Sequence, residues 1–167
     1  MKFERKKIIN LLVGALVLLA CVIVDLIAKK FTFGIDQDAI PGFFKFFYTQ
    51  NTGAAWSMFS GSTIALIVVS VLIIILIFVY GIFSKSKNPL FYVSLGLIVG
   101  GAFGNLIDRI FLGYVRDFIK LEFMDFPIFN TADCFLTVGV VCLVVFYLVE
   151  LIKERKAKKN QGGKNGI

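Results

Sequence analysis

Four apolar stretches, each about 20 residues long, constrain this chain more than any other feature of its sequence. They cover approximately residues 8–28, 63–83, 89–107 and 134–152. A stretch of this length can cross the hydrocarbon core of a bilayer as a helix. The composition agrees, because 58% of the 167 residues are hydrophobic and the mean hydropathy is +0.86, more than a soluble domain needs for its core. The sequence therefore predicts a mainly α membrane protein with four transmembrane helices, as one domain over residues 1–160 with a flexible tail over residues 161–167.

The positive charges fall mostly on one side of the predicted spans. Short flanks rich in Lys and Arg stay in the cytoplasm. Twelve of the eighteen Lys and Arg residues lie at the two ends of the chain or in the connection 84–88, and the other six share the opposite side with eight of the eleven acids. We therefore expect both termini and the tail to be cytoplasmic, and the two long connections, about 29–62 and 108–133, to be extracytoplasmic.

The net charge of +7 comes from these cytoplasmic flanks, which suit an anionic lipid leaflet. Nucleic-acid binding requires a basic face with aromatic platforms, which the flanks do not supply, so we expect no nucleic-acid partner. The three cysteines lie in or beside apolar spans without metal-ligand spacing, so we expect packing residues and neither a metal nor an organic cofactor. Around Cys21 the sequence also loosely imitates the processing site of a bacterial lipoprotein, but Leu19 is larger than such a site prefers and three further spans follow.

The long connections hold most of the remaining polar residues and several aromatic ones, as expected at a membrane interface. Ile40-Pro41-Gly42 is typical of a turn, and Phe43 to Tyr48 of a short extended segment. A second turn, Asn51-Thr52-Gly53, is expected to precede a short interfacial helix. The pattern predicts a small extracytoplasmic sheet lying on the membrane surface.

The third span carries glycines every four residues and polar groups at its outer end. Gly96, Gly100 and Gly104 form one helix stripe that lets a neighbouring helix approach closely. Asn105, Asp108 and Arg109, at i, i+3 and i+4, present an amide, a carboxylate and a guanidinium from one helix end. They form either an interfacial ion pair or a scaffold that fixes, by hydrogen bonds, the loop beginning at Ile110; the depth of Asn105 in the membrane favours the scaffold.

Asp25 and Lys29 form an i,i+4 pair at the outer end of the first span. The acid lies N-terminal to the base, which is the favourable order in a helix. The pattern favours a structural role, in which the pair ties this helix to the polar cluster. A substrate-contact role stays open, because the sequence does not indicate which way the helix faces.

Asp117 and Asp133 are the candidate catalytic residues. Gly113 to Ile119 predicts a turn that leads into a short apolar strand containing Asp117. Asn130 is placed to cap the fourth helix, whose first turn carries Asp133. If that turn meets the strand, the two carboxylates share a proton, and one acts as general base while the other acts as general acid in peptide hydrolysis. The chain has no histidine, so serine–histidine and histidine–zinc chemistry are excluded.

Other interpretations fit the same spacing. Two acids at these positions can instead cap a helix or form salt bridges. A small transporter or channel could use Asp25, Asp108 and Asp133 as an ion path, although the polar residues cluster at the outer ends of the spans. A non-enzymatic scaffold held by the glycine stripe would leave the converging carboxylates without a role.

Five ordered blocks, spread over essentially the whole chain, resemble the prolipoprotein signal peptidase family, also called signal peptidase II. The blocks are Asp25 with Lys29, residues 51–56 (NTGAAW), 100–109 (GGAFGNLIDR), 113–118 (GYVRDF) and 129–133 (FNTAD). The family usually has Gln after the first-span Asp, where this chain has Leu26.

The resemblance implies a membrane aspartic endopeptidase that removes the signal peptide from diacylglyceryl-modified bacterial prolipoproteins by cutting just before the lipidated cysteine. It implies that Asp117 and Asp133 are the catalytic dyad. The residues expected to line or support the substrate pocket are Asn51, Gly53, Asn105, Asp108, Arg109, Asn130, Asp25 and Lys29.

The same resemblance implies four transmembrane helices with an outer β-cradle and a short outer helix. It places the protein in the bacterial cytoplasmic membrane, with its active site at the extracytoplasmic face. The expected partners are the lipid-modified prolipoprotein and membrane lipid, and the expected state is a monomer.

Overall fold

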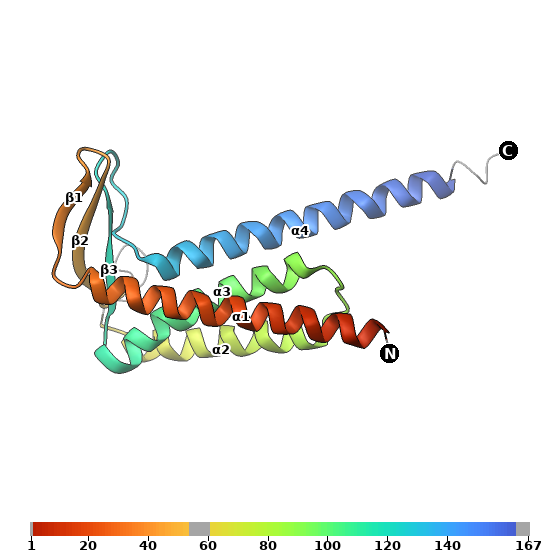
Figure 1. The fold of residues 1–167 in the computed structure, drawn as a ribbon, viewed down its shortest axis with the longest axis horizontal. Coiled ribbons are helices and arrows are strands. Elements are labelled where there is room, and N and C mark those ends of the chain that lie inside the picture. Colours follow the sequence, from red (N-terminus) through yellow and green to blue (C-terminus); the bar gives the residue numbers. More distant parts are fainter. Residues whose placement is uncertain (1, 54–60, 163–167) are drawn as a thin grey trace.

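The computed structural model describes residues 2–53 and 61–162. Its four long helices are α1 (Lys2–Phe31), α2 (Thr63–Phe83), α3 (Pro89–Leu112) and α4 (Thr131–Gly162). Each is long and apolar enough to cross a membrane, so the prediction of four spans is confirmed. In Figure 1 a small sheet stands at one end of the bundle, and both chain ends lie toward the other end.

The helices are longer than the apolar stretches, except for α2, which coincides with its prediction. Helix α3 continues past Ile107 to Leu112 and ends at Gly113, whose φ of 83° and N–H bond to the Arg109 carbonyl close the last turn. The loop therefore begins at Gly113, and the prediction of a loop from Ile110 was wrong. Helix α4 continues beyond Ile152 to Gly162 because the Lys- and Glu-rich sequence there retains high helix propensity.

Helix α3 is the central element, since it packs against α1, α2 and α4. The predicted glycine stripe faces α1: a Cβ added at Gly100 would lie 2.7 Å from the Cys21 Cβ, and one at Gly104 would lie 2.5 Å from the Asp25 carboxylate. On an adjacent side of α3, Gly101 abuts the Ala132 backbone at the start of α4. Close backbone approach at small residues is how helices pack where lipid removes the hydrophobic driving force.

The sheet has three antiparallel strands in the order β1 (Asp36–Ile40), β2 (Phe44–Asn51) and β3 (Val115–Leu121). The segments predicted to be extended correspond to β2 and β3, whereas β1, with its two acids, was not predicted. The first turn lies where it was predicted, with Gly42 at a φ of 72°. The position expected for the interfacial helix falls on residues 54–60, outside the described residues.

Candidate active site

Asp117 lies on β3 and is 2% exposed. On the neighbouring strand Thr49 is its register partner, so Asn51, two residues further along the same face, reaches the carboxylate. The Asn51 Nδ2 donates to Asp117 Oδ2 at 2.9 Å, and the Asn51 Oδ1 accepts from the Gly53 N–H at 2.9 Å. The strand pairing and the predicted turn together aim one amide at this acid.

Asp133 lies in the first turn of α4 and is half-buried. The Asp133 N–H donates to Asn130 Oδ1, and the Asn130 N–H donates to Asp133 Oδ2, both at 3.1 Å. This reciprocal arrangement is a capping box, and it confirms Asn130 as the predicted cap. The other carboxylate oxygen accepts from the Asn105 Nδ2 at 2.8 Å.

Asn130 also joins the two acids, because its Nδ2 donates to Asp117 Oδ1 at 2.6 Å. The backbone explains this proximity: the Phe129 carbonyl accepts from the Phe118 and Ile119 N–H groups, and the Phe129 N–H donates to the Ile119 carbonyl. Strand β3 is thereby pinned to the segment that enters α4. The structure thus brings the strand of Asp117 and the first helical turn of Asp133 together.

The environment of Asp117 favours a retained proton. The pKa of the Asp117 carboxyl is raised to about 6, chiefly by burial and also by the negative charge of Asp133, against the opposing effect of the hydrogen bonds from Asn51 and Asn130. A carboxyl with a raised pKa keeps a proton to higher pH than an ordinary aspartate does.

Lys29 is fully buried below the acids, at the contact of α1 with α3. Its ammonium lies 2.7 Å from Asp25 Oδ2 and 3.2 Å from Asp108 Oδ2. It also donates to Asn105 Oδ1 at 3.0 Å. Because Oδ1 of Asn105 accepts from Lys29, its Nδ2 is directed toward Asp133.

Asp25 in turn reaches the start of α4, accepting at its Oδ1 from the Thr131 hydroxyl at 2.6 Å and from the Ala132 N–H at 2.9 Å. The prediction that the Asp25–Lys29 pair ties the first helix to the polar cluster is confirmed.

Asp108 and Arg109 hold the two outer segments. Asp108 accepts from the Arg116 backbone N–H at 3.0 Å and from the Arg116 guanidinium at 2.6 Å. It therefore fixes the start of β3, next to Asp117. The Arg109 guanidinium donates to the Gly53 carbonyl at 3.0 Å. The helix end therefore acts as a scaffold, as one interpretation predicted, but it holds Arg116 and Gly53 and not a loop beginning at Ile110. The ion pair of the other interpretation is present as well, between Asp108 and Arg116.

A cavity of about 620 Å³ opens beside the acids. Its polar wall consists of Asn51, Asn105, Arg109, Asp117, Asp133 and Thr137. Its apolar wall includes Val115, Leu121, Phe126, Ile128, Phe129 and Val138. A chamber lined by both polar and apolar side chains suits an extended backbone with a bulky apolar group attached.

Sequence reasoning missed two contributors. Arg116 was counted only as a charge, although its place directly before Asp117 in a predicted turn was a usable signal. The apolar wall carried no signal, because its residues look like any other interfacial ones. Among the residues described, no three side chains of His, Cys, Asp or Glu gather as a metal site would require.

Comparison with known proteins gives a consistent result. A family profile described as signal peptidase (SPase) II matches residues 17–149. The lipoprotein signal peptidase of Enterococcus faecalis is 38% identical over 141 residues, which cover 84% of this chain and 85% of that protein. That of Lactobacillus johnsonii is 41% identical over 147 residues, covering 87% and 95%.

Two solved structures, each described as a bacterial membrane enzyme, share the fold. One has a TM-score of 0.78 at 32% identity and covers 83% of this chain and 88% of its own. The other has a TM-score of 0.74 at 33% identity, with 81% and 92% covered. On the family match and these relatives together, the chain is a multi-pass membrane peptidase and belongs to the signal peptidase II family.

Proposed function

We propose that this chain is an aspartic endopeptidase that removes the signal peptide from diacylglyceryl-modified bacterial prolipoproteins, cutting just before the lipidated cysteine. The observation that carries the proposal is a pair of carboxylates, Asp117 and Asp133, each held by side-chain amides at the wall of one cavity. The names of the relatives support the substrate class. Family membership also favours the peptidase over the transporter and scaffold hypotheses.

The chemistry assigned to the pair is that of a general base and a general acid. Ionised Asp133 takes a proton from a water molecule whose oxygen attacks the scissile carbonyl carbon. Protonated Asp117 donates its proton to the carbonyl oxygen, which gives a neutral tetrahedral intermediate. On collapse, Asp133 passes the proton that it took from water to the leaving nitrogen, and the C–N bond breaks. Asp117 takes a proton from the hydroxyl that becomes the new carbonyl, so the pair again holds one proton.

The surrounding residues supply position. Asn51 and Asn130 hold the Asp117 carboxyl plane, and Asn105 holds Asp133. Arg109 lines the cavity and binds the Gly53 carbonyl. Both residues can therefore hold the substrate backbone. The apolar wall suits the diacylglyceryl group, and the signal helix would lie along the transmembrane helices. We further assign the protein to the bacterial cytoplasmic membrane as a monomer, with the acids at the extracytoplasmic face.

The test is cleavage of a diacylglyceryl-modified prolipoprotein by purified protein in detergent. Asp117→Asn and Asp133→Asn should each lower kcat by at least about 100-fold, the lower limit for loss of a positioned acid or base. Asp125→Asn is the matched control, because it neutralises an exposed acid of the same outer connection. Circular dichroism should show that all three variants are folded.

Normal turnover by either site variant would refute the dyad. Absence of cleavage by the folded unmodified chain would refute the assignment of prolipoproteins as the substrate. Equal losses in the Asp125→Asn control would show that net charge, not the pair, controls the rate.

A further inference from the structure

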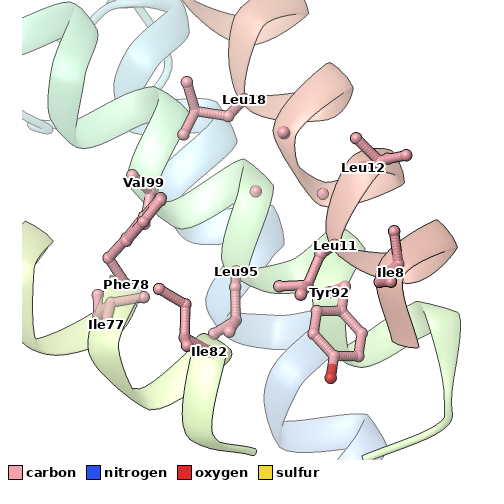
Figure 2. Close-up of a pocket in the computed structure, with 14 residues that line it drawn as sticks. Ile8, Leu11, Leu12, Leu18, Ile77, Phe78, Ile82, Tyr92, Leu95 and Val99 are labelled. Carbon is pink, nitrogen blue, oxygen red and sulfur yellow. The ribbon is translucent and has the colours of Figure 1, made fainter. Parts of the chain in front are cut away.

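An apolar crevice of about 350 Å³ lies between α1, α2 and α3, away from the acids. Figure 2 shows Leu18 and Val99 toward one end of it and Ile82 and Tyr92 toward the other. It exists because α1 and α2 both pack on α3 but, over the ranges the structure describes, scarcely touch each other. We call this space the α1–α2 crevice. Its lining runs from Ile8 to Leu18 on α1 and from Ile77 to Ile82 on α2.

The length of the crevice matches one leaflet. Its lining on α1 runs from Ile8 to Leu18, and ten residues of helix rise about 15 Å. The hydrocarbon core is about 30 Å thick, so the crevice covers about half of it. An acyl chain from one leaflet has this reach, whereas a transmembrane peptide helix would require a groove through the whole layer.

The crevice walls offer no polar group to a peptide. The polar side chain among the lining residues is that of Tyr92, and its hydroxyl donates to the Ser86 carbonyl at 3.1 Å. This bond also pins the 84–88 connection across the end of the crevice. A dry, apolar space of this kind suits a hydrocarbon chain.

Cationic side chains lie around the end of the crevice that is formed by Ile82 and Tyr92. The Lys7 ammonium donates to the Ile82 carbonyl at 2.7 Å and so bridges α1 and α2 at the crevice mouth. Lys6 and Lys85, both exposed, line an adjacent polar hollow of about 560 Å³. Basic groups beside a transmembrane crevice on the cytoplasmic side attract anionic lipid headgroups.

We propose that the α1–α2 crevice binds one acyl chain of an anionic phospholipid from the cytoplasmic leaflet, with the phosphate headgroup against Lys6, Lys7 and Lys85. The proposal rests on the assigned membrane orientation and is independent of the peptidase activity. The lipid fills the gap between two helices that both pack on α3 and make little contact with each other.

The experiment uses the full chain in proteoliposomes with a phosphatidylglycerol that carries a diazirine on one acyl chain. The phosphatidylcholine analogue with the same chain is the comparison lipid. After photolysis, mass spectrometry should find crosslinks concentrated in residues 8–18 and 77–82. Phosphatidylglycerol should be preferred by roughly fivefold for each lysine that contacts the headgroup.

Two pairs of variants isolate the contributions. Ala15→Phe places a ring in the crevice from an exposed lining position and should lower crosslinking severalfold, while Leu16→Phe, one residue on and outside the lining, should not. The double variant Lys7→Gln/Lys85→Gln should lower the phosphatidylglycerol preference by roughly 25-fold and leave only the contribution of Lys6. Lys156→Gln/Lys158→Gln makes the same charge change on the exposed end of α4 and should preserve it.

Three outcomes would overturn the proposal. Crosslinks spread evenly over the lipid-facing sides of α2 and α4 would mean bulk lipid alone. Equal labelling by the two headgroups would remove the anionic requirement. Displacement of the labelled lipid by a synthetic signal-peptide helix would make the crevice a peptide site. Cleavage of prolipoprotein, measured on the same samples, reports separately on the peptidase function.

Discussion

Three asparagine side chains organise the acids of this protein. Asn51 and Asn130 donate to Asp117, and Asn105 donates to Asp133. An amide has one end that accepts and one that donates, so each orientation is set by a second contact. For Asn105 that contact is the buried Lys29. An ammonium below the site therefore influences the carboxylates without touching them.

The raised pKa of Asp117 leads to a prediction about pH. In the proposed mechanism Asp117 is the general acid and reacts only while protonated, so kcat/KM should fall as pH rises above about 6, by about tenfold per pH unit. The sign follows from the role, because the reactive form of a general acid lies below its pKa. A profile of kcat/KM between pH 5 and 8 on a lipidated peptide measures it. A rate that instead rises through pH 6 would make Asp117 the base.

A second residue-scale prediction concerns Asn130. Asn130→Ala removes the cap of α4 and a hydrogen bond to Asp117, and should lower the free energy of unfolding by about 2 kcal/mol. Because that hydrogen bond lowers the Asp117 pKa, the fall in kcat/KM should move to higher pH. Thermal unfolding in detergent and the pH profile report the two effects.

The control for this variant is Asn88→Ala, which removes the cap of α3 at the other end of the bundle. It should lower stability by a similar amount and leave the pH profile unchanged. A shifted profile in the control would mean that loosening any helix end alters Asp117.

At the scale of elements, the position of α1 against α3 decides whether the site forms. Lys29 and Asp25 lie on α1, but their partners lie on α3 and at the start of α4. The glycine stripe of α3 permits this approach. Helix packing and the polar network therefore depend on the same contact, and spacing the helices apart would break both.

The prediction at this scale is that Gly96→Ala lowers both stability and cleavage. The added Cβ would clash with the Gly14 carbonyl of α1, and overpacking of this kind costs about 1–3 kcal/mol. Gly81→Ala is the matched control, because its Cβ would meet only the Leu95 side-chain end, at 3.1 Å. Thermal unfolding in detergent measures the difference, and equal effects of the two variants would contradict the packing argument.

At the scale of the whole molecule, β3 and the start of α4, which carry Asp117 and Asp133, lie at one end and the chain termini at the other (Figure 1). Lysines dominate the terminal end, and the acids share the other end with the sheet. This separation gives the molecule two chemically different ends, one suited to peptide hydrolysis and one to anionic lipid. The positive-inside rule is the basis of our proposal that the acids face the extracytoplasmic side.

Topology is therefore testable with reporter fusions in a bacterial host. Alkaline phosphatase fused after Asp125 should be active, because this connection should lie outside the cytoplasm, whereas a fusion after Lys87 or Lys158 should be inactive. A cytoplasmic fluorescent reporter at the same positions should give the reverse pattern. Activity of the phosphatase at Lys158 would place the C-terminus outside and overturn the orientation.

The sequence by itself determined the class of this protein, its four spans, its turns and the residue types of its site, because apolar length and charge position act locally. It predicted Asn130 as a cap, because Asn favours the position before a helix start. It predicted Gly96, Gly100 and Gly104 as a contact stripe, because helical periodicity places them on one face. Strand β1 escaped prediction because its five residues are all exposed and owe their conformation to pairing with β2.

What only the tertiary structure decided is which groups meet. Lys29 and Asn105 are 76 residues apart in the chain, and Asn51 and Asp117 are 66 apart. Their contacts follow from how α1 packs on α3 and how β2 pairs with β3, and no local pattern encodes either. The α1–α2 crevice is equally a product of assembly, because it is the space left where two helices pack on α3 and make little contact with each other.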